Sequence, residues 1–198
     1  MMIELPACPP IKEAVPRYIS FAVDQAPVLG GTDSRIVRMG DRWAVDVETY
    51  AVEYAEHGMK YLSRLVRGMK ETVRMAFREP GVKPRSYGAP VVASAGSAGT
   101  YLPVSGLIPG DVIKEGKFFS MVIGGTSFLY QVAVADVTVS GSGTATLQIE
   151  PMLRRQPAVG TALDFEPKIE GFIQGNEQSW NVSRSKYLPF RFTIKESA

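Results

Sequence analysis

The chain has 198 residues, 45% of them hydrophobic, with 14 prolines and 19 glycines. This size suits one large domain or two small ones, and the hydrophobic content supports a real core and argues against disorder. The formal net charge is only +2 and the basic residues are dispersed, which argues against a tight nucleic-acid binder, because such proteins concentrate positive charge against several phosphates. The densest basic run, residues 64–74, is interrupted by Glu71 and is better explained as the solvated face of a helix.

The few cysteine and histidine residues limit the chemistry that the chain offers. Cys8 is the only cysteine and His57 the only histidine, so we expect neither an intrachain disulfide nor a zinc site built from these residue types. The start of the chain lacks the basic and apolar regions of a signal peptide, and no apolar stretch approaches the ~20 residues that cross a bilayer. We therefore expect a soluble protein, made in the cytoplasm and not inserted in a membrane.

The N-terminal part alternates between apolar and polar residues. Residues 19–23 follow this period of two and predict a half-buried strand. A glycine-rich turn follows at residues 30–33, and residues 36–39 and 43–47 then predict a hairpin around a Gly-Asp pair. The apolar residues in the second arm of this hairpin face one way: Trp43, Val45 and Val47.

The period then changes to that of a helix. Apolar residues spaced three and four apart fall on one side of this helix: Val52, Ala55, Met59, Leu62, Val66 and Met69. Gly68 lies near its end, where helices often stop. Residues 73–77 return to a period of two, so the helix connects two strands and is expected to cover the sheet that they form.

A region rich in proline, glycine and serine, residues 79–98, separates this part from a series of short strands. The strands are predicted at residues 100–104, 118–123, 128–137 and 144–149, with glycine turns between them and no helical period. The pattern predicts a small β-barrel or sandwich, in which closure protects the strand edges from uncontrolled pairing.

The last part of the chain returns to strands like those at its start. They are predicted at residues 168–173, 180–182 and 189–196, and the last alternates apolar and polar residues without interruption. Because this final strand resembles the N-terminal strands more than those of the barrel, we infer that the barrel is inserted into the first domain.

The expected fold is therefore mainly β with one amphipathic helix. A discontinuous α+β domain comprises residues 1–88 and 167–198, and an inserted small β-barrel comprises residues 89–166. Both parts have viable domain sizes.

A search for catalytic chemistry finds no convincing site, because catalysis needs a nucleophile with a base, a metal, or paired acids in a cleft. Cys8 has no expected base near it, and the glycine-flanked Ser97 lacks the preceding strand, following helix and later histidine of a hydrolase elbow. His57 lies off the apolar side of the helix, and nothing places Asp136 and Glu150 in one cleft. We therefore expect no catalytic, cofactor-binding or metal-binding residues and no enzymatic activity.

The aromatic residues offer binding surfaces instead. Trp43 and Trp180 both fall on predicted strands, which favours core packing over sugar stacking. Phe118 and Phe119 are adjacent and must point to opposite faces of a strand, so at least one lies outside the barrel core. Phe119 and Tyr130 are the resulting candidate contacts for a partner protein, a neighbouring subunit or a glycan.

The order of several short motifs resembles a known family. In the first domain these are Arg35-Ile-Val-Arg38, Gly40-Asp-Arg-Trp43, Leu65-Val-Arg-Gly68 and Glu79-Pro-Gly81. In the barrel they are Gly106-Leu-Ile-Pro-Gly110, Glu115-Gly-Lys-Phe-Phe-Ser120, Gly143-Thr-Ala-Thr-Leu147 and Glu150-Pro-Met-Leu-Arg154. Over most of its length the chain is similar to the distal tail proteins, which lie at the tail tip of long, non-contractile-tailed phages.

The resemblance implies a ring-forming β domain, often with a second barrel of the oligonucleotide/oligosaccharide-binding type. It implies a structural virion protein of the tail tip or baseplate, which forms a homohexameric ring between the tail tube protein and the hub or receptor-binding proteins. A ring whose lumen passes DNA should not bind phosphates tightly, and the weak net charge is compatible with that. We accordingly expect no specific nucleic-acid binding. A second class of function stays open: the barrel as a carbohydrate-binding accessory module of a tail or cell-surface assembly.

Overall fold

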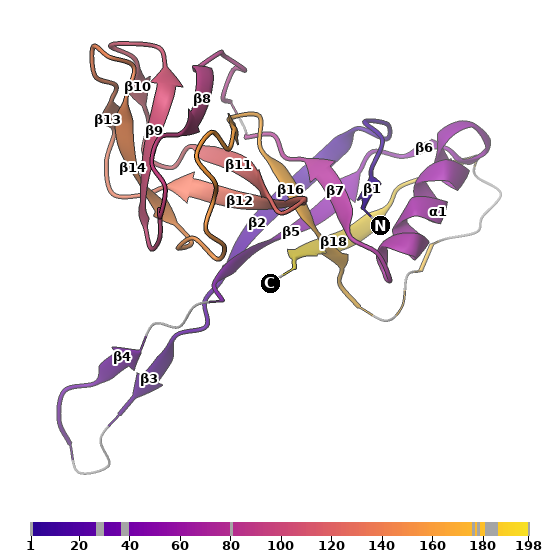
Figure 1. The fold of residues 1–198 in the computed structure, drawn as a ribbon. Coiled ribbons are helices and arrows are strands. Elements are labelled where there is room, and N and C mark those ends of the chain that lie inside the picture. Colours follow the sequence, from indigo (N-terminus) through magenta and orange to yellow (C-terminus); the bar gives the residue numbers. More distant parts are fainter. Residues whose placement is uncertain are drawn as a thin grey trace.

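The computed structural model describes residues 2–26, 30–36, 40–79, 81–175, 177, 179–180 and 186–197. Over these residues the fold is mainly β, with two six-stranded sheets and one short α-helix (Figure 1). The fold class expected from the sequence is therefore confirmed.

The first sheet has the strand order β1-β7-β16-β18-β5-β2. Its strands are β1 (Ile3–Glu4), β2 (Ile11–Ile19), β5 (Arg42–Thr49), β7 (Val73–Ala76), β16 (Lys168–Ile173) and β18 (Arg191–Glu196). Neighbours run antiparallel, except that β1 and β7 are parallel. Trp43, Val45 and Val47 of β5 point into one apolar core with Ile194 of β18, as the period of two in these strands predicts.

A helical segment packs on the core side of this sheet. A π-helical turn, η1 (Tyr54–Gly58), leads directly into α1 (Met59–Gly68). Tyr61 of α1 packs against Phe190 and Phe192, with ring centroids 5.3 and 6.0 Å apart. The helix therefore covers the sheet, as predicted.

The buried face of α1 differs from the predicted one. Met59 and Val66 are 51% and 44% exposed, whereas Tyr61, Leu62 and Leu65 are buried. The π turn explains the difference: it holds more residues per turn than an α-helix, so a phase counted from its start does not carry into α1. The predicted apolar side is therefore only partly right: Val52, Leu62 and Met69 pack on the core, whereas Ala55, Met59 and Val66 are exposed.

Gly68 is the last residue of α1, but its role is packing. A Cβ atom at this position would lie 2.5 Å from Val73 Cγ1 and 2.8 Å from Ile173 Cγ1. Glycine is thus needed because the helix end lies directly on β7 and β16, rather than because the backbone leaves the helical region there.

The second sheet has the strand order β15-β11-β12-β14-β9-β8. Its strands are β8 (Gly88–Val92), β9 (Tyr101–Leu107), β11 (Phe118–Ile123), β12 (Thr126–Val132), β14 (Ala145–Glu150) and β15 (Leu163–Asp164). A bridge between Val91 and Ala162 brings the two outer strands together, so the sheet nearly closes into a barrel. The pair β10 (Val112–Ile113) and β13 (Val137–Thr138) lies beside it.

All strands of the second sheet lie between residues 88 and 164, and those of the first sheet lie before or after this range. The division into domains of residues 1–88 with 167–198 and of 89–166 stays a prediction, because Phe118 and Leu129 of the second sheet pack into the core of the first. The two sheets and α1 together are called the body below.

The predicted strand boundaries agree with the structure for some strands and not for others. The strands at residues 118–123 and 168–173 have the predicted bounds. The strand predicted at residues 128–137 instead ends at Val132. No strand was expected at β8, whose Pro90 and Gly88 are typical of loops.

The predicted hairpin around Gly40 is wrong. The strand β3 (Val23–Gln25) pairs with β4 (Ser34–Ile36), and β5 pairs with β2 and β18 instead. Residues 37–39, part of that hairpin, lie outside the described part of the chain. The remaining two-stranded pair joins β6 (Val52–Glu53) to β17 (Tyr187–Leu188).

Candidate assembly surfaces

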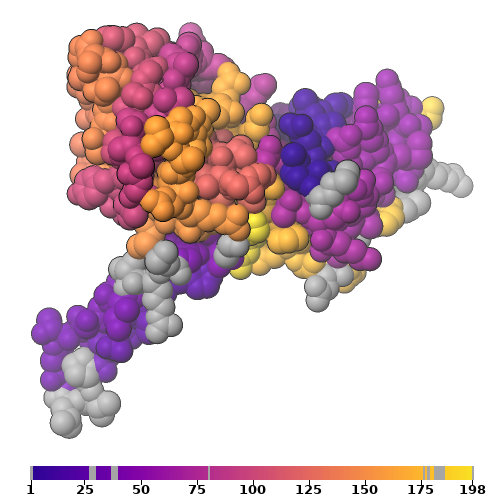
Figure 2. Space-filling view, in the orientation of Figure 1, coloured from indigo at the N-terminus to yellow at the C-terminus, as the bar shows by residue number. Residues whose placement is uncertain are grey.

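A two-stranded arm projects from the body. We define the arm as residues 20–26 and 30–36, which include β3 and β4; Figures 1 and 2 show it extending away from both sheets. Val23 lies opposite Ile36 in the pairing register, and the next pair is Asp24 with Arg35. Because side chains alternate along a strand, one face of the arm carries Val23 and Ile36 and the other carries the Asp24–Arg35 ion pair, at 3.4 Å.

The apolar face of the arm is exposed to solvent in the described structure. Phe21, Val23 and Ile36 are 39%, 41% and 39% exposed. The expected half-buried strand at residues 19–23 is therefore wrong beyond Ile19: the chain keeps its alternation but leaves the body. A two-stranded ribbon alone is only marginally stable in water, so an apolar face of this kind is expected to gain from contact with a partner.

The root of the arm is fixed to both sheets. The Phe21 N–H donates to Asp41 Oδ1 at 2.6 Å, and the Arg42 guanidinium lies 4.7 Å from the centre of the Phe21 ring. The Tyr18 hydroxyl lies 2.9 Å from Asp41 Oδ2 and 3.0 Å from Glu150 Oε2, at the end of β14. Burial and hydrogen bonds to the two carboxyl groups raise the pKa of Tyr18, so its phenol stays neutral and serves as a donor. The direction of the arm is thus tied to the barrel.

A groove opens at the other end of β2. It lies between the two outer strands of the first sheet, β1 and β2, and has a volume of about 930 Å³. Its apolar lining comes from the N-terminal segment, α1 and β7: Met2, Leu5, Pro6, Ala7, Pro9, Pro10, Ile11, Ala14, Tyr61 and Met75. We call this site the groove. It is the described cavity with the largest share of apolar lining residues.

Four cationic side chains also line the groove: Lys12, Arg64, Arg67 and Arg78. Lys12 pairs with Glu48 at 2.7 Å, Arg67 pairs with Glu71 at 3.0 Å, and Arg64 donates to the backbone oxygen of Glu4. Arg78 has no ionic partner among the residues that the structure describes. The groove thus combines an apolar lining with charged side chains, two of which, Lys12 and Arg67, are already neutralised by Glu48 and Glu71.

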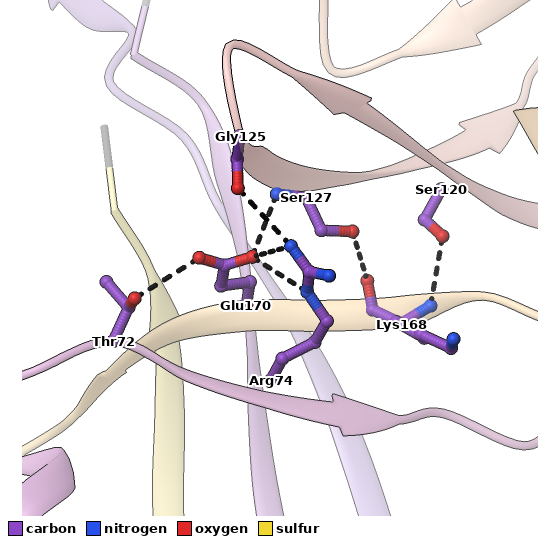
Figure 3. Close-up of polar contacts among 7 residues, drawn as sticks. All are labelled: Thr72, Arg74, Ser120, Gly125, Ser127, Lys168 and Glu170. Carbon is purple, nitrogen blue, oxygen red and sulfur yellow. Dashed lines mark hydrogen bonds and ion pairs between the residues drawn. The ribbon is translucent and has the colours of Figure 1, made fainter. Parts of the chain in front are cut away.

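A junction of buried carboxylates fixes the barrel to the first sheet. Figure 3 shows the first of them, Glu170 of β16. Its Oε2 atom accepts hydrogen bonds from Arg74 Nη2 at 2.6 Å and from the Ser127 N–H at 2.9 Å, and its Oε1 atom accepts one from Thr72 at 3.2 Å. Arg74 comes from the first sheet and Ser127 from the barrel, so this one side chain joins both.

Glu196 of β18 makes a second connection of the same kind. It accepts hydrogen bonds from the backbone N–H groups of Trp43 and Leu129, at 2.8 and 2.7 Å, and from Arg154 Nη2 at 2.8 Å. Burial raises the pKa of the Glu196 carboxyl, and the Arg154 guanidinium and the two N–H groups act in the opposite direction. The ionised Glu196 carboxylate therefore needs all three hydrogen-bond donors to offset the cost of its burial.

Glu79 makes the third connection. It pairs with the buried Lys117 and accepts the Phe118 N–H at 2.9 Å. In β12, pairing with β14 is limited to Gln131 and Val132, so the N–H groups of residues 127 and 129 lie beyond that ladder and would otherwise lack acceptors. The three glutamates thus satisfy backbone groups of the barrel from outside it. We call Glu79, Glu170, Glu196 and their partners the junction.

The two residues expected to contact a glycan or partner are both inaccessible. Phe119 and Tyr130 are completely buried in the barrel core, where their rings stack with centroids 5.7 Å apart. Burial raises the pKa of Tyr130 to about 12. The expectation that they form a contact surface is therefore wrong, because both point to the inner face of the barrel.

Phe118 does point away from the barrel core, as predicted, but it meets the first sheet. Its ring lies 5.0 Å from Trp43 and 5.1 Å from Phe77, in edge-to-face geometry. Trp43 is buried, as predicted. Trp180 is 41% exposed and lies in no strand, so its expected core packing is wrong; residues 181 and 182 of the strand predicted there lie outside the described part.

The residues considered for catalysis remain scattered. Cys8 is a free, half-buried thiol beside the groove, and His57 is exposed, 3.7 Å from Glu56. The Ser97 hydroxyl donates to the backbone oxygen of Ser94. Asp136 accepts the Glu115 N–H, and its companion candidate Glu150 instead contacts Tyr18. The structure therefore brings none of these candidates together.

Within the described residues, no three Asp, Glu, His or Cys side chains gather closely enough to hold a metal ion. None of the helices in that part of the chain has the length and apolar character needed to traverse a bilayer. The chain matches no protein-family model, and no curated protein is found to be similar to it. The functional argument therefore depends on the arm, the groove and the junction.

Sequence reasoning missed these three features for different reasons. The arm and the groove leave no motif of their own. The junction leaves a partial signal, since Glu196 has the same strand parity as the buried residues Phe192 and Ile194 and is thus placed on the core face.

Proposed function

We propose that this chain is a structural subunit of a phage tail tip, which assembles into a homohexameric ring between the tail tube and the hub or receptor-binding apparatus. The resemblance of its motifs to distal tail proteins motivates the proposal. The observation that carries it is the arm: an amphipathic ribbon whose apolar residues Phe21, Val23 and Ile36 are 39%, 41% and 39% exposed.

A ring requires a repeated contact at a constant angle. A contact between two different surfaces of the same chain closes into a ring when its rotation is right, and otherwise continues as a filament. The junction supports a constant angle, because three buried carboxylates hold the two sheets together. The root of the arm supports it too, because Tyr18 and Asp41 fix the arm to the body.

The proposal is tested on the purified full chain by size-exclusion chromatography with light scattering and by negative-stain microscopy. We expect ring-shaped hexamers and co-purification with the tail tube protein of the same phage. A chain that stays monomeric at every concentration up to its solubility limit, and that does not bind the tube protein, would contradict the proposal.

A carbohydrate-binding module is the second candidate, and one observation favours it. The exposed Trp180 borders a second, open depression, separate from the groove, which is also lined by Gln174, Asp46 and Thr193. An exposed indole beside hydrogen-bonding groups suits the stacking and polar recognition of a sugar ring. We expect any glycan-array signal to disappear in Trp180→Ala and to persist in Tyr101→Ala, which removes an exposed tyrosine of the barrel. A blank array with the unmodified chain would remove this candidate.

A further inference from the structure

We propose that the arm of one copy lies in the groove of the next copy, and that this contact is the one that builds the ring. The inference rests on the proposed function, because it identifies the two surfaces that a ring of this chain would join. The occupant of the groove is therefore the apolar face of the arm, with Val23 and Ile36 directed toward the groove's apolar lining.

The arm and the groove both expose apolar surface, so contact between them would bury apolar area on both sides. The arm exposes apolar side chains on a ribbon that packs on neither core, and the groove is a large depression lined mainly by apolar residues. Burial of apolar surface on both sides is favourable at about 25 cal/mol per Å². No segment among the described residues of the same chain lies in the groove, which leaves a second copy as the nearest source of a matching ribbon.

The strand edges at the groove are also suited to a ribbon. The outer strands of the first sheet, β1 and β2, each pair on one side only. An edge strand presents unpaired N–H and C=O groups that accept an added strand. A ribbon entering between these edges gains backbone hydrogen bonds as well as apolar contacts.

The charges of the two surfaces also favour binding of the arm in the groove. Of the four cationic side chains that line the groove, Lys12 and Arg67 already pair with Glu48 and Glu71, so Arg64 and Arg78 are the ones left to meet an acidic partner. Residues 20–41, which contain the arm and its root, have three aspartates and two arginines. Asp33 is an exposed acidic residue near the distal end of the arm, and Arg78 is a cation without an ionic partner in the described residues. Complementary charge of this kind sets register and association rate more than affinity.

The positions of the two surfaces produce a head-to-tail contact. The Ile19 end of β2 continues into the arm, and the Ile11 end of the same strand lines the groove. One strand thus separates donor from acceptor, so a copy that receives an arm at one end offers its own arm at the other. Such a contact repeats until it closes.

The native Cys8 provides a direct test, because its neighbours Ala7 and Pro9 line the groove and it is the only cysteine of the chain. Cysteine is introduced singly at three exposed arm positions, Gln25→Cys, Thr32→Cys and Ser34→Cys. A disulfide forms only when the two Cα atoms come within roughly 7 Å, so cross-linking reports direct contact. The products are read on non-reducing gels after mild oxidation of the full chain.

We expect at least one arm cysteine to give a ladder of disulfide-linked oligomers, about tenfold stronger than the background of the unmodified chain. The ladder should disappear when Cys8→Ser is added. The matched control is Ser140→Cys, an exposed serine in a turn of the barrel, which should give no ladder.

A charge exchange supplies an independent readout. Arg78→Glu is expected to slow assembly about tenfold, and Asp33→Lys in the same chain is expected to restore part of the rate, since it returns an opposite charge to the pair.

The outcomes distinguish this inference from the proposed function. If the unmodified chain forms rings but none of the three arm cysteines links to Cys8 above the Ser140→Cys control, the arm–groove contact is wrong and the ring proposal stands. If rings form only with the tube protein present and cross-links appear only then, a second copy still occupies the groove. If no assembly occurs under any condition, both proposals fail.

Discussion

The junction and the arm differ in how their side chains are covered. The junction consists of buried charged side chains, whereas the arm carries exposed apolar side chains. At the junction, Glu170 and Glu196 are buried, and every donor that they need comes from the same chain. On the arm, Val23 and Ile36 lie opposite each other in the pairing register, and both remain exposed. The two carboxylates therefore have their donors within the single chain, whereas the arm keeps exposed apolar side chains that, in our proposal, a partner covers.

This contrast separates folding from assembly. A buried charge stripped of its partner is costly, so junction residues are expected to control the stability of the single chain. An exposed apolar residue costs the monomer little, so arm residues are expected to control association instead. The four predictions below test this separation.

The largest effect is expected for Glu196→Ala. The change leaves the Arg154 guanidinium buried without its anion and leaves the N–H groups of Trp43 and Leu129 without an acceptor. Loss of one partner of a buried ion pair costs roughly 3–5 kcal/mol, and we expect the free energy of unfolding to fall by that amount. Urea unfolding followed by tryptophan fluorescence measures it.

The matched control for this change is Lys195→Ala. This residue is adjacent in β18 and points to the opposite face of the sheet, so its removal should alter stability by no more than ~0.5 kcal/mol. Equal losses for the two variants would show that the carboxylate has no special role and that the strand itself is fragile.

A smaller loss is expected for Gly68→Ala. The added methyl group would lie 2.5 Å from Val73 Cγ1 and 2.8 Å from Ile173 Cγ1, so the end of α1 must move away from the sheet. Overpacking of this kind costs typically 1–3 kcal/mol, although alanine favours the helix more than glycine does. Ser63→Ala on the exposed side of α1 is the control and should be neutral or slightly stabilising. A gain in stability for Gly68→Ala would contradict the close packing.

The alternation of apolar and polar residues predicted the buried side chains correctly in strands whose apolar face packs into a core. The alternation of residues 43–47 and 73–77 identifies the buried side chains of β5 and β7 for this reason. The same alternation in residues 19–23 led to a wrong prediction, because a period of two identifies an apolar face without identifying what covers it. The arm is the place where that distinction matters.

The junction escaped prediction because its partners are distant in sequence. Glu196 bonds to Arg154, 42 residues away, and to Leu129, 67 residues away, so no local spacing connects them. The adjacency of Phe118 and Phe119 correctly placed them on opposite faces, but it does not say which of the two faces is the inner one. The predicted glycan contacts failed at that step, because Phe119 and Tyr130 lie on the inner face of the barrel, whereas Phe118 lies on the outer face, against the first sheet.

Exposed ion pairs offer a third, weaker test of the comparison. Arg17 pairs with Asp46 at 2.6 Å on the outer face of the first sheet, and the hydrogen bond from Arg17 lowers the pKa of Asp46. A lowered pKa stabilises the folded chain above the pKa of the unfolded state, and that contribution disappears as pH falls through the folded value. Because this pair is solvent-screened, Arg17→Ala should cost at most ~1 kcal/mol at neutral pH and nothing in strong acid. A larger loss, or one independent of pH, would place this pair with the junction.

The smallest effect on the single chain is expected for the double variant Val23→Ser with Ile36→Ser. Both side chains lie outside the two apolar cores, so unfolding of the monomer should change by no more than ~0.5 kcal/mol. Assembly stabilises the folded state by mass action, so the unfolding midpoint of the unmodified chain should rise with protein concentration. The variant should show no such rise, and the two midpoints should converge at high dilution. A variant midpoint that is lower at every concentration would mean that the arm packs on its own body, because only a contact within the chain is independent of dilution.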